Sequence, residues 1–247
     1  MSALAARRWA LIVAPVAAGT LTIVGVIADP APGAEGRELV EAYASDPDAL
    51  NFKSLGYHFA YTIWLAAALG IVGLVRRRGS WLANVAGLLA ILGISSIPGF
   101  LVSDFIDSAM GRLVGINEAV RVGDAVEEQW GLAVMAVPGF AGLLLALPLA
   151  AIAAWRAALL PWWGAVSVIA GMAAFIGFDA TLAGNVLLTV AFAAFAAALT
   201  RMDPAVWQSP WHPADRPGRL SLAWFQRLKL ERDRQGSTTI TKRLVEE

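Results

Sequence analysis

Six stretches of this sequence contain no charged residue and are long enough to cross a bilayer. A hydrocarbon core about 30 Å thick needs roughly 20 apolar residues in a helix that rises 1.5 Å per residue. A helix also satisfies its backbone hydrogen bonds within one segment, which lipid demands. The six runs lie at residues 9–28, 55–75, 81–102, 131–155, 160–178 and 180–200. We therefore predict an all-α, polytopic membrane helix bundle with six transmembrane helices over residues 1–201.

The composition supports this fold class. Hydrophobic residues make up 58% of the chain and charged residues 15%, whereas about a quarter of an ordinary soluble domain is charged. The chain has no cysteine, which excludes disulfides, thiolate metal sites and cysteine nucleophiles. The formal net charge is zero, so we expect no nucleic-acid partner.

Arginines near the ends of the runs predict the orientation. Basic residues close to span ends favour the cytoplasmic side of a membrane. The arginines near the span ends all fall on one side of the predicted bundle, and they are Arg7, Arg8, Arg76, Arg77, Arg78, Arg156 and Arg201. Placing this side inside leaves only Arg37, Lys53, Arg112 and Arg121 outside. We therefore predict a multi-pass protein of the plasma membrane, with both the N-terminus and the C-terminus in the cytoplasm.

Tryptophans occur near the predicted span ends, as expected for an interfacial aromatic belt. Trp9, Trp81, Trp155, Trp162 and Trp163 lie at predicted inner ends, and Trp130 lies at an outer one. An alternative reading of the first run is a cleavable signal peptide, cut after Ala28. The run is longer than the 7 to 15 residues typical of a signal core, which favours a retained span.

Two acidic segments, 29–54 and 103–130, are too long to be simple turns. Residues 37–44 are expected to form a short helix that Asp46-Pro47-Asp48 stops. In the second segment, apolar residues at near-helical spacing predict an amphipathic helix along the membrane surface. These residues are Leu113, Ile116, Val120 and Ala125. An ordinary solvated connector is the alternative for both segments.

Residues 202–247 form a predicted cytoplasmic tail that begins with several prolines and continues as a basic amphipathic helix at 220–234. Such a helix can lie on an anionic leaflet or dock on a partner protein. Its candidate contact residues are Trp224, Phe225, Arg227, Leu228 and Lys229. A tail without a specific role is the alternative.

Polar side chains within or beside the spans are the candidate functional residues, because polar groups are costly in lipid. They gather toward the predicted outer side at Tyr57, His58, Tyr61, Ser95, Ser96, Asp104, Asp107, Asp179 and Asn185. Prolines at 98 and 138, each followed by glycine, predict two interrupted helices at a similar depth, and hence an outward-facing pocket. These same residues can instead mark where spans meet water.

The residue types fit few catalytic sites. The two histidines, His58 and His212, fall on opposite predicted sides, which does not fit a bis-histidine haem or a three-histidine zinc site. Phosphate-loop, dinucleotide and nucleophile-elbow motifs are missing from the sequence. We therefore expect no cofactor and no metal. The sequence favours a non-catalytic accessory or scaffold subunit of a larger membrane complex, with lipid and another membrane protein as partners. A small-solute or lipid transporter or receptor is the alternative, and an intramembrane enzyme using His58 is a third.

Overall fold

The computed structural model describes residues 2–76, 78–179 and 181–208, and no strand occurs among them. The described helices belong to the compact unit Met1–Trp207. Their bounds are α1 Ala3–Ala28, α2 Gly36–Ser45, α3 Pro47–Val72, α4 Ser80–Leu113, α5 Ile116–Glu127, α6 Trp130–Arg156, α7 Trp162–Gly177, α8 Leu182–Thr200 and α9 Pro204–Gln208. The predicted tail helix at 220–234, with Trp224, Phe225, Arg227, Leu228 and Lys229, lies outside the described residues.

Among the described residues, five helices are long and apolar enough to cross a bilayer, namely α1, α3, α4, α6 and α8. The apolar helix α7 has 16 residues, which gives a length of roughly 24 Å at 1.5 Å per residue. The predicted all-α class is confirmed, and the several apolar helices are those of a membrane-embedded protein. The predicted fifth span, 160–178, coincides with α7, which is shorter than the other five apolar helices.

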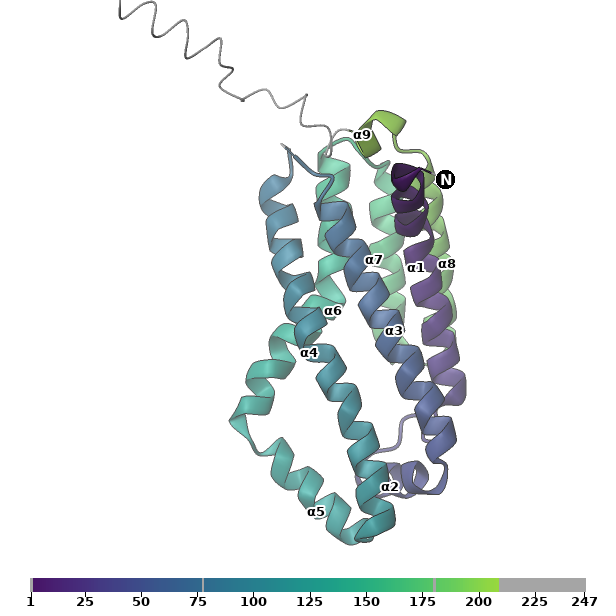
Figure 1. Ribbon diagram of the computed structural model, residues 1–247, viewed down its shortest axis with the longest axis vertical. Coiled ribbons are helices and arrows are strands. Elements are labelled where there is room, and N and C mark those ends of the chain that lie inside the picture. Colours follow the sequence, from purple (N-terminus) through teal and green to yellow (C-terminus); the bar gives the residue numbers. More distant parts are fainter. Residues whose placement is uncertain (1, 77, 180, 209–247) are drawn as a thin grey trace, which may run out of the picture. The chain divides into compact units, whose positions relative to one another are not determined.

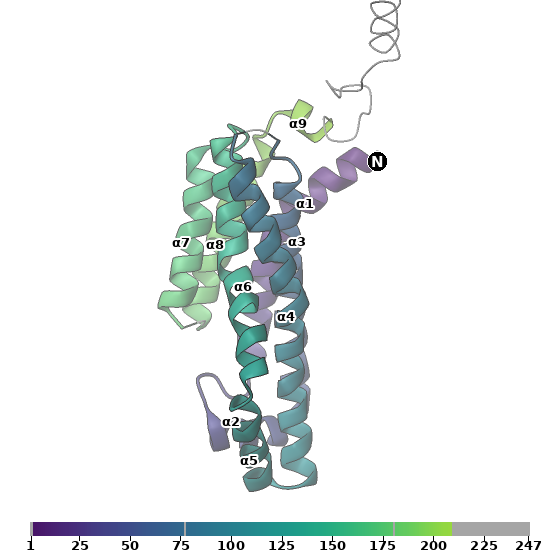
Figure 2. The same ribbon diagram turned by 90° about the vertical axis from the view of Figure 1, so that its left-hand side faces the viewer.

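The long helices alternate in direction, so that most connections lie at two ends (Figure 1), whereas the α7–α8 turn lies part-way along the bundle (Figure 2). The N-terminus, the α3–α4 connection and α9 lie at one end, whereas α2 and α5 lie at the other. We call the first the arginine end, because Arg7, Arg76, Arg156 and Arg201 are near the helix termini there. The opposite end, with α2 and α5, is called the acidic end.

Glycines allow neighbouring helices to approach closely. The main contacts join α4 to α6 and α3, α1 to α3 and α8, and α7 to α8, and Figures 1 and 2 show these helices side by side. A Cβ on Gly142 of α6 would lie 2.2 Å from the Leu89 carbonyl oxygen of α4. A Cβ on Gly171 of α7 would lie 2.6 Å from the Ala191 Cβ of α8. Small residues at helix crossings are typical of membrane bundles.

The two predicted helix interruptions are wrong. Helix α4 continues through Pro98, and α6 continues through Pro138 and Pro148. A proline removes one backbone hydrogen bond, and packing against neighbouring helices lets a membrane helix tolerate this loss. Broken helices therefore do not support the predicted outward-facing pocket.

Helices α3 and α4 extend beyond the predicted spans at the acidic end. Helix α3 begins at Pro47, because the Asp46 carboxylate caps it by accepting a hydrogen bond from the Ala49 amide at 3.0 Å. Proline is well suited to this first position of a helix. At its own far end, α4 continues to Leu113 before α5 begins. The two predicted short helices correspond to α2 and α5, except that Leu113, expected in the second of them, is the last residue of α4.

Exposed tryptophans lie near helix ends, as the predicted belt requires. Trp9, Trp81 and Trp162 are exposed near the arginine end, and Trp130 is exposed at the start of α6. Along α6, the distance from Trp130 to Trp155 is roughly 38 Å at 1.5 Å per residue. This length matches a hydrocarbon core of about 30 Å with part of each interfacial layer.

Candidate functional site

Five side chains form a hydrogen-bonded group near the acidic end, which we call the ion-pair cluster: Tyr43, Lys53, Ser54, Asp104 and Ser108. Lys53 Nζ lies 2.9 Å from Asp104 Oδ2 and also donates to the Tyr43 hydroxyl. The Ser54 hydroxyl donates to the same Asp104 oxygen at 3.0 Å. The Ser108 hydroxyl donates to the Tyr43 carbonyl oxygen at 2.7 Å. The cluster therefore joins α2, α3 and α4.

The positions of the cluster residues along their helices, together with apolar packing, bring them together. Asp104 and Ser108 are four residues apart on α4, so they share one helix face. Lys53 and Ser54 lie on the first turns of α3, after the Asp46 cap. Tyr43 is buried, at 2% exposure, in a small apolar cluster with Ala31 and Leu50, against which Phe105 and other side chains pack. This apolar packing holds α2, α3 and α4 together and keeps the polar atoms of the cluster within hydrogen-bonding distance.

The two charges of the cluster are largely removed from solvent. The side chains of Lys53 and Asp104 are 11% and 16% exposed. A buried charge is tolerated when an opposite charge and further hydrogen bonds compensate its desolvation. Here the Lys53 ammonium has a carboxylate and a phenol as partners, and Asp104 has an ammonium and a hydroxyl.

Tyr43 contributes to the cluster as a neutral phenol. Burial raises the pKa of Tyr43 above its ordinary value of 10, although the hydrogen bond from Lys53 acts in the opposite direction. A neutral hydroxyl can accept from the ammonium without adding a second negative charge beside Asp104. The position of the Lys53 ammonium over the Tyr43 ring, 4.6 Å from its centre, adds a cation–π contact.

An aromatic column follows α3 from the cluster into the bundle. The rings of Tyr57 and Tyr61 stack with their centres 5.4 Å apart, and Tyr61 meets the edge of Trp64 at 5.5 Å. Trp64 is fully buried and also contacts Phe175 of α7 and Phe192 of α8. Its indole donates to the Leu143 carbonyl oxygen of α6 at 3.0 Å. This column ties α3 to three other helices.

The structure brings some predicted site residues together. Asp104 lies in the ion-pair cluster, and Tyr57 and Tyr61 lie in the adjoining aromatic column. Asp107 is half-buried on α4, three residues beyond Asp104. His58 is half-buried, and its ring meets the edge of the Phe59 ring at 5.2 Å.

Other predicted site residues have local roles. Exposed Ser95 donates to the Leu92 carbonyl oxygen at 2.9 Å, and buried Ser96 packs against Gly139 of α6. Asp179 is exposed in the α7–α8 turn with a φ of 49°, and buried Asn185 donates to the Thr181 carbonyl oxygen at 2.9 Å. None of the described hydrogen bonds joins any of these four side chains to the ion-pair cluster.

Four members of the cluster are not among the predicted site residues, namely Tyr43, Lys53, Ser54 and Ser108, and the sequence predicts Lys53 only as one of the outer basic residues. One available signal was charge complementarity. Lys53 lies two residues before the second apolar run, and Asp104 lies two residues after the third run. Consecutive antiparallel helices bring such positions to the same depth, so a pair could have been proposed.

Comparisons with protein-family models, curated proteins and solved structures give no match to this chain. Among the described residues, no three His, Cys, Asp or Glu side chains are grouped so that they could hold a metal ion. The chemistry that the cluster itself can perform is charge compensation. Its side chains bind one another and connect three helices.

Large apolar side chains are exposed beside this cluster. Val102, Ile106 and Leu113 recur on α4 at intervals of four and seven residues, so they follow one face of the helix. They are 51%, 53% and 83% exposed, respectively. We call these three residues the apolar edge of α4.

Proposed function

We propose that this protein crosses the membrane six times and acts as a non-catalytic accessory or scaffold subunit of a larger membrane complex. The observation that supports this role is the apolar edge. Helix α4 has 34 residues and is therefore roughly 51 Å long, whereas the hydrocarbon core is about 30 Å thick. Starting from Trp81, a span of that thickness ends near Val102, and Leu113 lies roughly 16 Å further along.

Exposed apolar residues that lie beyond the hydrocarbon core are not covered by lipid, so they need an apolar surface of another protein to exclude water. Water contact costs about 25 cal/mol per Å² of apolar surface, and exposed apolar patches mark interaction sites. A neighbouring membrane protein that packs along α4 would cover the edge without a break from lipid to water. The ion-pair cluster holds α2, α3 and α4 together beside that surface.

The ion-pair cluster favours a subunit over the alternative of a small-solute or lipid transporter or receptor. A ligand that uses Asp104 would have to displace both Lys53 and Ser54 from its carboxylate. Leaving the Lys53 ammonium without this partner in a mostly buried position is strongly unfavourable. The cluster is thus better suited to holding the helices than to exchanging ligands.

The proposed orientation places the N-terminus inside and the acidic end outside, and the absence of cysteine from the chain makes this testable. Ser45→Cys at the end of α2 is expected to react with a membrane-impermeant maleimide in intact cells. Ser2→Cys, before α1, should react only after the cells are permeabilised. Equal labelling of both variants in intact cells, or the reverse pattern, would contradict the proposed orientation.

Association through the apolar edge is tested by purification from the native membrane in a mild detergent. We expect the chain to elute with a companion protein in a fixed ratio, and Leu113→Ser to reduce the recovered companion at least about fivefold, because it replaces the most exposed side chain of the apolar edge with a hydroxyl. Val126→Ser on α5 is the matched control and should retain the companion. Recovery of the wild-type chain as a lone, stable monomer would overturn the proposed role.

A further inference from the structure

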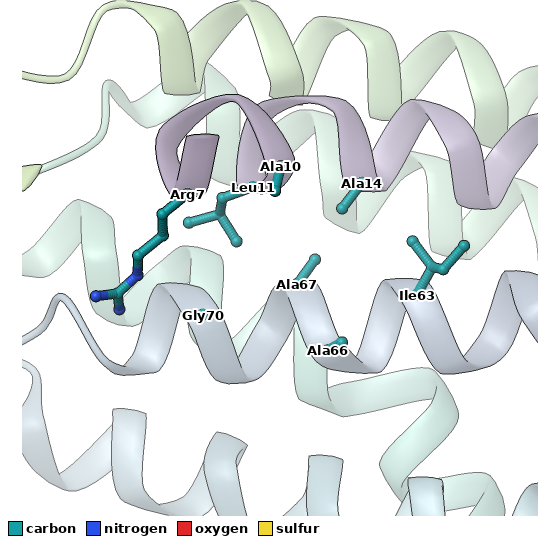
Figure 3. Close-up of a pocket in the computed structure, with 8 residues that line it drawn as sticks. All are labelled: Arg7, Ala10, Leu11, Ala14, Ile63, Ala66, Ala67 and Gly70. Atoms are coloured by element: carbon teal, nitrogen blue, oxygen red, sulfur yellow. The ribbon is translucent and has the colours of Figure 1, made fainter. Parts of the chain in front are cut away.

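A groove between α1 and α3 near the arginine end has the shape and lining of a lipid site. Its volume is about 250 Å³. The lining residues, labelled in Figure 3, are Arg7, Ala10, Leu11, Ala14, Ile63, Ala66, Ala67 and Gly70. All except Arg7 are apolar, and five are glycine or alanine, whose small side chains leave the space between the two helices.

The groove has a buried floor and an exposed rim. Leu11 is 8% exposed and Ala67 is 1% exposed, so they form the floor. Ala10 and Ala66 are exposed at the rim, on opposite helices. From Arg7 to Ala14 the groove follows about two turns of α1, or roughly 10 Å. Figure 3 shows Ala14 and Ile63 at the end furthest from Arg7.

Arg7 provides the one charged side chain of the groove. Its side chain extends from α1 toward the C-terminal end of α3, as Figure 3 shows. Its Nη2 atom would lie 3.8 Å from a Cβ on Gly73, just beyond the last residue of α3. A guanidinium has five N–H donors in a fork that fits phosphate, and it can serve more than one acceptor. Charge is therefore confined to the end of the groove that lies nearest the membrane surface.

We propose that this groove binds an anionic phospholipid, with the phosphate at Arg7 and the first part of one acyl chain between α1 and α3. The volume is slightly below the roughly 300 Å³ of typical ligand pockets, which suits part of a chain better than a whole lipid. Both the charge and the apolar floor are needed for this occupant. An anion alone would make no use of the floor, and an uncharged lipid would make no use of Arg7.

The test measures thermal unfolding of the full chain in detergent with added phosphatidylglycerol, phosphatidylcholine or inorganic phosphate. Phosphatidylglycerol is expected to raise the unfolding temperature more than phosphatidylcholine does, and inorganic phosphate should leave it unchanged. Arg7→Gln should weaken phosphatidylglycerol binding about tenfold, the loss of one charge-assisted contact. Arg78→Gln, an exposed arginine at the same end and outside the groove, should bind as the wild type does.

A second variant tests the acyl part of the site without changing charge. Ala14→Leu places a larger side chain in the half-buried far end of the groove, and it is expected to reduce retention of phosphatidylglycerol in native mass spectrometry. Ala193→Leu, at an exposed position on α8, is the matched control. Equal stabilisation by both lipids, stabilisation by phosphate alone, or equal binding by the Arg7 and Arg78 variants would overturn the proposal. So would full lipid retention in the Ala14 variant, whatever the stability of the Arg7 variant.

Discussion

Replacing Lys53 by methionine is expected to lower the free energy of unfolding by about 3 kcal/mol, the lower end of the cost of breaking a buried ion pair. The substitution preserves much of the apolar stem but leaves Asp104 as a mostly buried carboxylate whose remaining cluster partner is the Ser54 hydroxyl. It also removes the donor to the Tyr43 hydroxyl. Denaturant-induced unfolding in detergent micelles, followed by circular dichroism, measures the change.

Two further variants separate burial of the pair from a general effect of losing a cation. Arg37→Met breaks the exposed ion pair with Glu41, whose side chains are 55% and 51% exposed, together with an exposed hydrogen bond to Asn117, and should cost about 1 kcal/mol. Lys53→Met combined with Asp104→Leu removes both charges and should recover most of the lost stability. Equal losses for the Lys53 and Arg37 single variants would show that the cluster is not closed to solvent.

Most of the fold could be predicted because hydrophobic run length depends directly on bilayer thickness. The six runs correspond to α1, α3, α4, α6, α7 and α8. The boundaries of α3 and α4 were less predictable, because loss of hydrophobicity marks the edge of lipid and not the end of a helix. Asp46 alone separates α2 from α3, and it caps the start of α3. The acidic residues that follow Val102 are still part of α4.

The candidate site was harder to predict because its pairs join separate helices. The polar character of Tyr57, Tyr61 and Asp104 identified these positions, but their partners depend on how α2, α3 and α4 pack. The prolines predicted broken helices because the loss of a backbone hydrogen bond at proline can be read from the local sequence. The packing that compensates for it is not visible in one segment. The burial of Trp64 likewise depends on packing, because α6, α7 and α8 all contact it.

The contact between α4 and α6 leads to a second prediction of comparable size. Gly142→Ala is expected to destabilise the protein by about 3 kcal/mol, the upper end of the usual cost of overpacking. The added Cβ would lie 2.2 Å from the Leu89 carbonyl oxygen and 2.7 Å from the Gly93 amide nitrogen. Both are backbone atoms, so no side-chain rotation can relieve the overlap, and the two helices must separate along their shared face.

Gly99→Ala on α4 is the matched control, because nothing lies within 4 Å of the Cβ that it would add. Alanine is favoured over glycine inside a helix by up to about 1 kcal/mol, so this variant should be neutral or slightly more stable. Thermal unfolding in detergent is compared for both variants, with far-ultraviolet circular dichroism to verify that helix content is retained. If Gly142→Ala unfolds at the wild-type temperature, then α4 and α6 do not meet at the backbone distance that places Gly93 against Gly142, and the close packing of these two helices would have to be abandoned.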